Sequence, residues 1–128
     1  MSRYGKNLVM LDTDDTTRAL LETAYERFNA RDIDAVLALM TSDVDWPNGW
    51  EGGYVHGHDE VRDYWTRQWA AIDGTVTPEA LSTRPDGRID VTVHQVVKNL
   101  EGELLEDCIV HHIYRLRGDQ VAHMEIGR

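Results

Sequence analysis

Hydrophobic residues recur every three or four positions in the first half of the chain, a spacing that predicts helices. Residues 12–17 supply carboxylate and hydroxyl groups that suit a helix start, so we expect a first helix from about residue 14 to residues 29–31. Its apolar side is formed by Leu20, Leu21, Ala24, Tyr25 and Phe28. Asp32 can cap a second, short helix with the apolar residues Ile33, Val36, Leu37 and Met40.

A third helix is predicted after the glycine-rich stretch 49–57. Asp59 and Glu60 place negative charge where a helix N-terminus favours it. The helix should end near Asp73-Gly74, with Gly74 as a left-handed cap. Its apolar side is formed by Val61, Tyr64, Trp65, Trp69 and Ile72.

From Thr75 onward the pattern changes to alternation of β-branched and polar residues, which is typical of strands. Turn residues interrupt it at 85–87, 101–102 and 118–119. These features predict a four-stranded antiparallel meander. Helices first and a meander afterwards indicate an α+β fold, with N-terminal helices packed on one face of a curved antiparallel sheet.

The strands at 88–100 and 103–117 each have two distinct faces. If Glu101-Gly102 is a two-residue hairpin loop, the antiparallel register places His94, Asp107 and His111 on one surface. That surface also carries Val96, Ile109 and Ile113, and so it suits a ligand pocket or an ordinary half-exposed face. A one-residue bulge would separate the two histidines.

Composition narrows the class of protein. The length of 128 residues fits one domain, which we place at 14–128 after an N-terminal arm, residues 1–13. The formal charge of −10 argues against a nucleic-acid partner. No apolar run approaches the ~20 residues that span a bilayer, and the first residues do not resemble a signal peptide, so we expect no membrane partner and a cytoplasmic location. The single cysteine, Cys108, excludes an internal disulfide.

Aromatic residues gather in the loop after Asp45. Trp46, Trp50 and Tyr54 lie within a few positions of one another, and with Tyr64 they can form flat walls around a ring-shaped ligand or plug the core. His56 and His58 supply at most half of a metal site, and no third ligand is placed by spacing, so we expect no metal.

Four side chains are candidates for acid/base chemistry. His94 and His111 titrate near neutral pH and can exchange protons with a substrate, although strand histidines more often pack or face water. Asp107 can orient one of them, or it is simply solvated. Asp45 can act as a base if a pocket desolvates it, but alternation along 44–46 can turn it outward when Trp46 points in.

Three segments, 24–40, 43–44 and 57–65, followed by the meander, resemble the nuclear transport factor 2-like superfamily and, within it, the SnoaL-like and ketosteroid isomerase-like proteins. The resemblance covers about residues 16–126. It implies a cone-shaped half-barrel whose open end admits a small apolar molecule, in a homodimer joined through the outer sheet face.

Matching the ketosteroid isomerase pattern position by position places the oxyanion-hole tyrosine near Ala24, with Tyr25 one position away. The general-base aspartate falls near Asn48, or at Trp46 if the prolines are aligned. The second oxyanion acid falls at His111, which implies that His111 points inward.

The sequence supports three hypotheses about function. The first is an acid/base enzyme without a cofactor, of isomerase, dehydratase or cyclase type, acting on a largely apolar cyclic substrate. The second is a non-catalytic protein that binds hydrophobic ligands. The third is a dimerisation module that uses the apolar face formed by Val91, Val93, Val97, Cys108 and Val110. The expected ligand contacts are Tyr25, Trp46, Trp50, Tyr54, Tyr64, Val96, Ile109, Ile113 and Met124.

Overall fold

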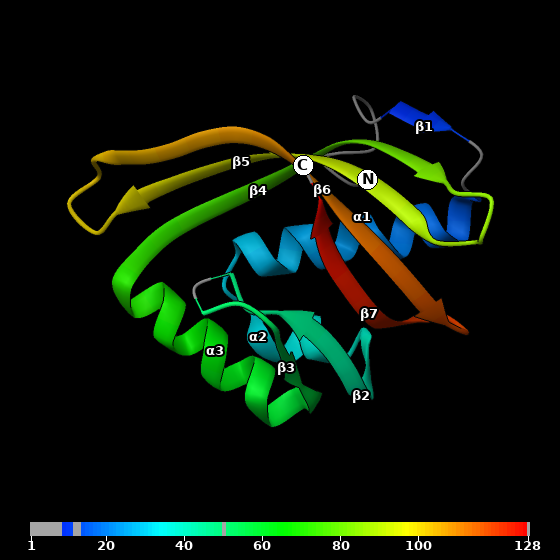
Figure 1. Ribbon diagram of the computed structural model, residues 1–128, viewed down its shortest axis with the longest axis horizontal. Helices are drawn as coiled ribbons and strands as arrows, with labels where there is room; N and C mark the ends of the chain where they lie inside the picture. Colours follow the sequence, from blue (N-terminus) through cyan, green and yellow to red (C-terminus); the bar gives the residue numbers. More distant parts are fainter. Residues whose placement is uncertain (1–8, 12–13, 50, 128) are drawn as a thin grey trace.

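Three helices and a seven-stranded sheet form the part of the chain that the computed structural model describes, residues 9–11, 14–49 and 51–127 (Figure 1). The helices are α1 (Asp15–Asn29), α2 (Ile33–Leu37) and α3 (Gly57–Ala71). The strands are β1 (Val9–Leu11), β2 (Met40–Pro47), β3 (Tyr54–His56), β4 (Ile72–Thr83), β5 (Ile89–Asn99), β6 (Leu104–Arg117) and β7 (Gln120–Gly127).

The strands are ordered β1-β4-β5-β6-β7-β2-β3. Strands β4 to β7 form the predicted antiparallel meander, whereas β1 runs parallel to β4 and β2 runs parallel to β7. The sheet curves over the helices, which lie on its concave side (Figure 1). The predicted α+β fold is therefore confirmed. Except for β1, the predicted arm lies outside the described residues.

The hairpin between β5 and β6 differs from the prediction in its loop but not in its register. Its loop is residues 100–102, because the Asn99 amide donates to the Glu103 carbonyl at 2.9 Å, and Gly102 has a φ of 89°. A bulge between Val97 and Lys98 compensates for the longer loop. His94 therefore lies opposite Ile109, and His94, Asp107 and His111 share one side of the sheet as predicted.

The helix boundaries follow the local chemistry of the chain. Asp14 caps α1 by accepting from the Thr17 amide at 2.7 Å, and Asp32 caps α2 by accepting from Ala35. The prediction that Gly74 caps α3 is wrong. The helix ends at Ala71, and Ile72 already has extended backbone angles, so Gly74 lies within β4.

The main core lies between the helices and the concave sheet face. Val91 and Val93 of β5 are fully covered, as is Val61 of α3, and Leu21 of α1 is almost so. The idea that the face around Val91, Val93 and Val110 is a dimerisation surface is therefore wrong, because the helices already cover it. No helix among the described residues is long and apolar enough to cross a membrane.

Asn29, the last residue of α1, holds the helix to the sheet. Its side-chain amide donates to the Val76 carbonyl at 2.7 Å and accepts from the Val76 amide at 3.0 Å. This pair satisfies both backbone groups of one residue in β4. The two hydrogen bonds also fix the position of the C-terminal end of α1 along β4.

Replacing Asn29 with Ala should lower the free energy of unfolding by about 2 kcal/mol, because both Val76 backbone groups lose their partner in a half-buried setting. Urea denaturation measures this. Asp34→Ala is the control, since it removes an ion pair with Arg62 whose side chains are 82% and 47% exposed, and it should cost no more than about 0.5 kcal/mol. Equal effects of the two substitutions would contradict the proposed role of Asn29.

Candidate functional site

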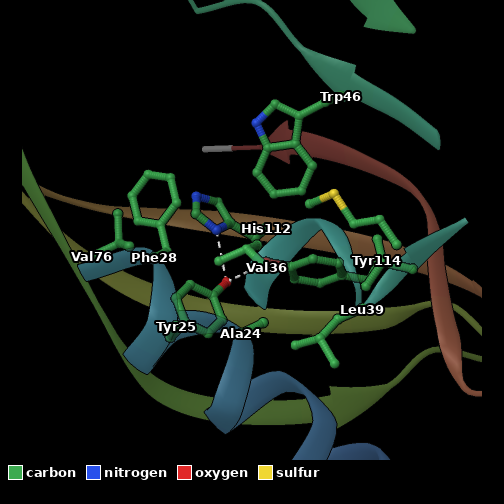
Figure 2. A pocket seen from close by; sticks show the side chains of 11 residues that line it. Ala24, Tyr25, Phe28, Val36, Leu39, Trp46, Val76, His112 and Tyr114 are labelled. Carbon is green, nitrogen blue, oxygen red and sulfur yellow. Dashed lines mark hydrogen bonds between the residues drawn. The ribbon is translucent and has the colours of Figure 1, made fainter. Parts of the chain in front are cut away.

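Two adjoining pockets lie between the helices and the concave face of the sheet. The first has a volume of about 50 Å³ and the second about 110 Å³. They share Phe28, Trp46, Val76 and His112, so a ligand can extend from one into the other. The first is lined by Ala24, Tyr25, Phe28, Val36, Leu39, Met40, Trp46, Val76, His112, Tyr114 and Val121 (Figure 2).

Three buried polar side chains form a hydrogen-bonded chain at the first pocket. The Tyr25 hydroxyl of α1 lies 2.7 Å from Nδ1 of His112 and 2.8 Å from the Tyr114 hydroxyl, both on β6. The Tyr25 and His112 rings are stacked, with centroids 5.8 Å apart. Figure 2 shows the three side chains meeting at the Tyr25 oxygen. These three side chains supply the hydroxyl and imidazole groups of this pocket, which is also lined by Trp46 with its indole N–H.

Burial keeps all three groups neutral at neutral pH. It lowers the pKa of His112 to about 4, with a smaller contribution from the neighbouring charge of His111. Burial also raises the pKa of Tyr25 and of Tyr114 well above the ordinary tyrosine value. The site is therefore a set of neutral hydrogen-bonding groups in an apolar cavity.

The direction of these hydrogen bonds fixes the tautomer of His112. Tyr25 is the acceptor available to the Tyr114 hydroxyl among the described residues, so Tyr114 donates to Tyr25. Tyr25 then donates to Nδ1 of His112, and the proton of the neutral ring is on Nε2. No described residue is hydrogen-bonded to Nε2, and His112 lines both pockets. The Nε2–H group is thus a donor available to a ligand.

Aromatic rings form the walls of the cavity on the helix side. Trp65 packs edge to face against Phe28 and Trp46, with centroids 5.2 and 5.4 Å apart. Trp69 packs beside Trp65, and the Arg31 guanidinium lies 4.8 Å from the Trp69 ring. Flat, apolar walls with few polar groups are typical of sites for ring-shaped ligands.

Tyr64 connects this wall to the loop after β2. Its hydroxyl accepts a hydrogen bond from the Gly49 amide at 2.9 Å, and its ring lines the second pocket beside Gln68. Burial raises the pKa of Tyr64. Gly49, in the loop after β2, is therefore anchored at the pocket by Tyr64.

The expected catalytic histidines lie on the opposite side of the sheet. Nε2 of His94 is 2.6 Å from Asp107, and Nδ1 of His111 is 2.8 Å from Asp90, with the two histidine side chains 38% and 36% exposed. The prediction that His111 points inward is wrong, because consecutive residues of a strand face opposite sides and His112 takes the inward position. The sheet lies between the cavity and His94, His111 and Asp107, so these side chains do not contact a ligand in the cavity.

The expected apolar contacts on that side of the sheet are misplaced for the same reason. Val96, Ile109 and Ile113 share the outer side with His94 and His111 and line neither pocket. The sequence analysis considered the more apolar faces of β5 and β6 as a dimerisation surface. In the structure these faces line both the core and the cavity.

Asp45 also points away from the cavity. This is the outward orientation that we considered for Asp45 if Trp46 points inward. It accepts a hydrogen bond from His56 at 2.6 Å, which lowers the pKa of Asp45, and lies 3.5 Å from His123. Tyr54 is 40% exposed and packs on His123, so it lines neither pocket. A role of Asp45 or Tyr54 in the cavity is not supported by these positions.

Four of the expected ligand contacts do line the cavity. Tyr25 lines the first pocket, Tyr64 and Met124 line the second, and Trp46 lines both. Their contact with a ligand stays a prediction. Trp50 lies outside the described residues.

Sequence reasoning missed His112 and Tyr114. The sequence contains one indication of them: His112 shares a face of β6 with Val110 and Tyr114. A lone imidazole between a valine and a tyrosine on an apolar face indicates a buried polar group, which needs a partner from another element.

The two loop histidines are engaged in the protein. His56 binds Asp45, and Nε2 of His58 lies 3.1 Å from the Met40 carbonyl. Within the described residues, no three histidine, cysteine, aspartate or glutamate side chains are grouped as metal ligands.

Comparison with known proteins gives one family and many solved structures of the same shape. A family profile described as a SnoaL-like domain matches residues 21–124. An NTF2-like protein of unknown function from Burkholderia pseudomallei is 25% identical, with a TM-score of 0.76 over 88% of this chain and 90% of that one. No curated protein matches the chain.

Two further structures contain organic ligands. TerC, co-crystallised with polyporic acid, is 23% identical, with a TM-score of 0.76 over 88% of this chain and 90% of that one. RV0760c from Mycobacterium tuberculosis, in complex with estradiol-17beta-hemisuccinate, is 20% identical, with a TM-score of 0.73 over 87% of this chain and 92% of that one. At these identities the likeness shows the fold alone.

The buried His112 should make the protein less stable in mild acid. Its pKa is 6.5 in an unfolded chain and about 4 when folded, so the unfolded state takes up the proton first and stability falls as the pH drops from 6.5 to 4. The loss should approach about 3 kcal/mol. Urea denaturation at pH 7 and pH 4.5 of the wild type and of His112→Gln measures it, since other titrating groups are common to both proteins.

A pH dependence that is equally steep in His112→Gln would contradict this assignment. The nitrogen chemical shifts of the ring give an independent check by NMR. At pH 7 they should show an unprotonated Nδ1 and a protonated Nε2.

Proposed function

The chain belongs to the SnoaL-like domain family, and on that premise we propose that its cavity binds a small, largely apolar ring compound and acts on it by acid/base chemistry without a cofactor. The reaction is of isomerase, dehydratase or cyclase type. One observation carries the proposal: the Nε2–H of a neutral, buried His112 is available at the junction of two apolar pockets.

The geometry suits stabilisation of a negative oxygen. A neutral imidazole N–H in a cavity with little water binds a carbonyl oxygen and stabilises the enolate that forms when a neighbouring carbon loses a proton. Tyr25 and Tyr114 hold the ring in one tautomer and one orientation, so the donor is in place before a ligand arrives. Three connected side chains thus act through one hydrogen-bond donor.

The walls support a cyclic ligand. Phe28, Trp46, Trp65 and Trp69 offer flat apolar surfaces to a ring system. Estradiol-17beta-hemisuccinate in one structural neighbour and polyporic acid in another are compatible with this class of ligand.

Binding without reaction is the second candidate. No described carboxylate lines either pocket, so the proton acceptor of an enolisation would have to be a water molecule or a basic group of the substrate itself. A cavity that holds a carbonyl but lacks a strong base suits a carrier or a sensor. This feature keeps the non-catalytic hypothesis open beside the enzyme.

Exchange of the α-protons of 2-tetralone for deuterium, followed by NMR, separates the two candidates. If the chain is an enzyme, the wild type should accelerate the exchange, and His112→Phe should reduce the acceleration by about a hundredfold because the donor to the enolate is lost. His112→Gln retains an N–H donor and should restore part of the rate. Saturable binding by calorimetry with no exchange above the buffer rate would select the carrier or sensor instead.

A homodimer through the outer sheet face belongs to the same proposal. The side of β5 and β6 that carries His94 and His111 also carries Ile109, which is 49% exposed, and the half-buried Val96. Alternating apolar and charged groups on one face suit a surface that packs against a second copy.

Light scattering should give a mass of two chains for the wild type and of one chain for Ile109→Lys, because the substitution places a charge in the centre of the interface. Tyr54→Lys is the matched control, since Tyr54 is 40% exposed but lies in β3 at the far edge of the sheet. A monomeric wild type, or a dimer that survives Ile109→Lys, would refute this interface.

A further inference from the structure

The outer side of β5 and β6 carries two histidine–aspartate pairs. Nε2 of His94 lies 2.6 Å from Asp107, and Nδ1 of His111 lies 2.8 Å from Asp90. Ile109 lies opposite His94 and two residues before His111, so the two pairs flank the exposed apolar side chain on which the proposed dimer is centred. The helices lie on the concave side of the sheet (Figure 1), so no described helix covers these pairs.

The two aspartates differ in their positive partners. Asp90 also accepts a hydrogen bond from Nη2 of Arg84 at 2.9 Å. Burial opposes ionisation of Asp90, but the hydrogen bonds from His111 and Arg84 outweigh it and lower the pKa of this carboxyl group. Among the described residues, Asp107 has His94 as its one partner. A guanidinium therefore neutralises Asp90 at every pH, whereas Asp107 is neutralised only when the imidazole of His94 is protonated.

The surroundings do not supply another positive partner for Asp107. Thr77 of β4, which lies opposite His94, is uncharged. The other charged and titratable side chains on the strands around this pair are Asp73 and Glu79 of β4, Asp90 and Lys98 of β5, Glu103 just before β6, and Glu106, His111 and Arg115 of β6. Lys98 and Arg115 are the fixed cations of this set, and in the described part of the chain neither forms an ion pair with Asp107.

Packing a second copy on this face would remove water from the pair. The side chains of His94 and Asp107 are 38% and 52% exposed in the single chain, so water still screens the carboxylate. In a closed interface the carboxylate loses that water, and an uncompensated buried charge is costly. Two-fold symmetry brings one such carboxylate from each copy into the same interface. A proton on each His94 converts each carboxylate into an ion pair without net charge and removes much of this cost.

We propose that the outer face is a proton-dependent interface for a second copy of the chain, in which dimerisation takes up protons at His94. The dimer then binds more protons than two separate chains, so its Kd decreases as the pH falls from 8 to 6. This inference rests on the homodimer of the proposed function and adds its regulation. It gives His94 and Asp107, which do not reach the cavity, a role on their own side of the sheet.

Sedimentation equilibrium at pH 6, 7 and 8 tests the inference by measuring the Kd of the dimer. The wild type should have a Kd about tenfold lower at pH 6 than at pH 8. His94→Gln keeps an uncharged hydrogen-bonding group beside Asp107, and its Kd should change by less than about twofold over this range. His111→Gln is the matched control and should keep the dependence of the wild type, because Arg84 already neutralises Asp90.

Asp107→Asn separates proton uptake from the simple loss of a contact. The substitution removes the charge that has to be buried, so the Kd at pH 8 should decrease by about tenfold and should no longer depend on the state of His94. If the pair were only a structural contact, the same substitution would weaken the dimer.

The outcomes separate this inference from the homodimer itself. A wild-type dimer with the same Kd at the three pH values refutes the inference and leaves the dimer in place. A pH dependence that survives in His94→Gln or disappears in His111→Gln, or a Kd at pH 8 that increases in Asp107→Asn, does the same. A wild type that is monomeric at all three pH values refutes the homodimer and this inference with it.

Discussion

The buried hydroxyl of Tyr25 is the contact on which the arrangement of helix, sheet and cavity depends. It joins α1 to two residues of β6, which lies in the middle of the seven-stranded sheet. The bond is made where almost no water reaches, since Tyr25 is 3% exposed and His112 5%. An unsatisfied polar group there would be costly, so the position of α1, the tautomer of His112 and the shape of the first pocket are determined together. One turn further along the helix, Asn29 joins α1 to β4 through its two hydrogen bonds with Val76.

A neutral site within a strongly acidic protein is a consequence of this burial. The chain has a formal charge of −10, yet no described carboxylate lines either pocket, and the titratable groups at the first pocket are two tyrosines and an uncharged histidine. The imidazoles that carry carboxylate partners lie outside, where His94 meets Asp107 and His111 meets Asp90. The sheet therefore separates two histidine environments that are adjacent in sequence. The pKa of His112 lies far below neutrality because its ring is buried away from water. His112 therefore contributes a hydrogen bond of defined geometry and no charge.

The sequence predicted the fold to a large extent because periodicity reports which side of an element is covered. Helical spacing and alternation gave three helices and a meander, and the register between His94 and Ile109 was correct although the hairpin loop was one residue longer than expected. The site was predicted only in part. Alternation shows that His111 and His112 face opposite sides, but it does not show which side is concave. That depends on where the helices pack, and the more apolar face was considered as a dimerisation surface, although it forms the core and lines a cavity. Tyr25 and Trp46 were placed correctly because large aromatic residues lie inward whether or not a cavity is present.

The position of β7 has a consequence for how the chain reaches this state. Strand β7 lies between β6 and β2, so Met40 is paired with Val121, which is made much later during synthesis. Strands β2 and β3 follow α2 in the sequence but cannot join the sheet until β7 is available. Val44 and Trp46 of β2 therefore stay uncovered until the meander has been synthesised. Long-range pairing of this kind slows folding, and the nascent chain carries its most aromatic segment exposed during that interval.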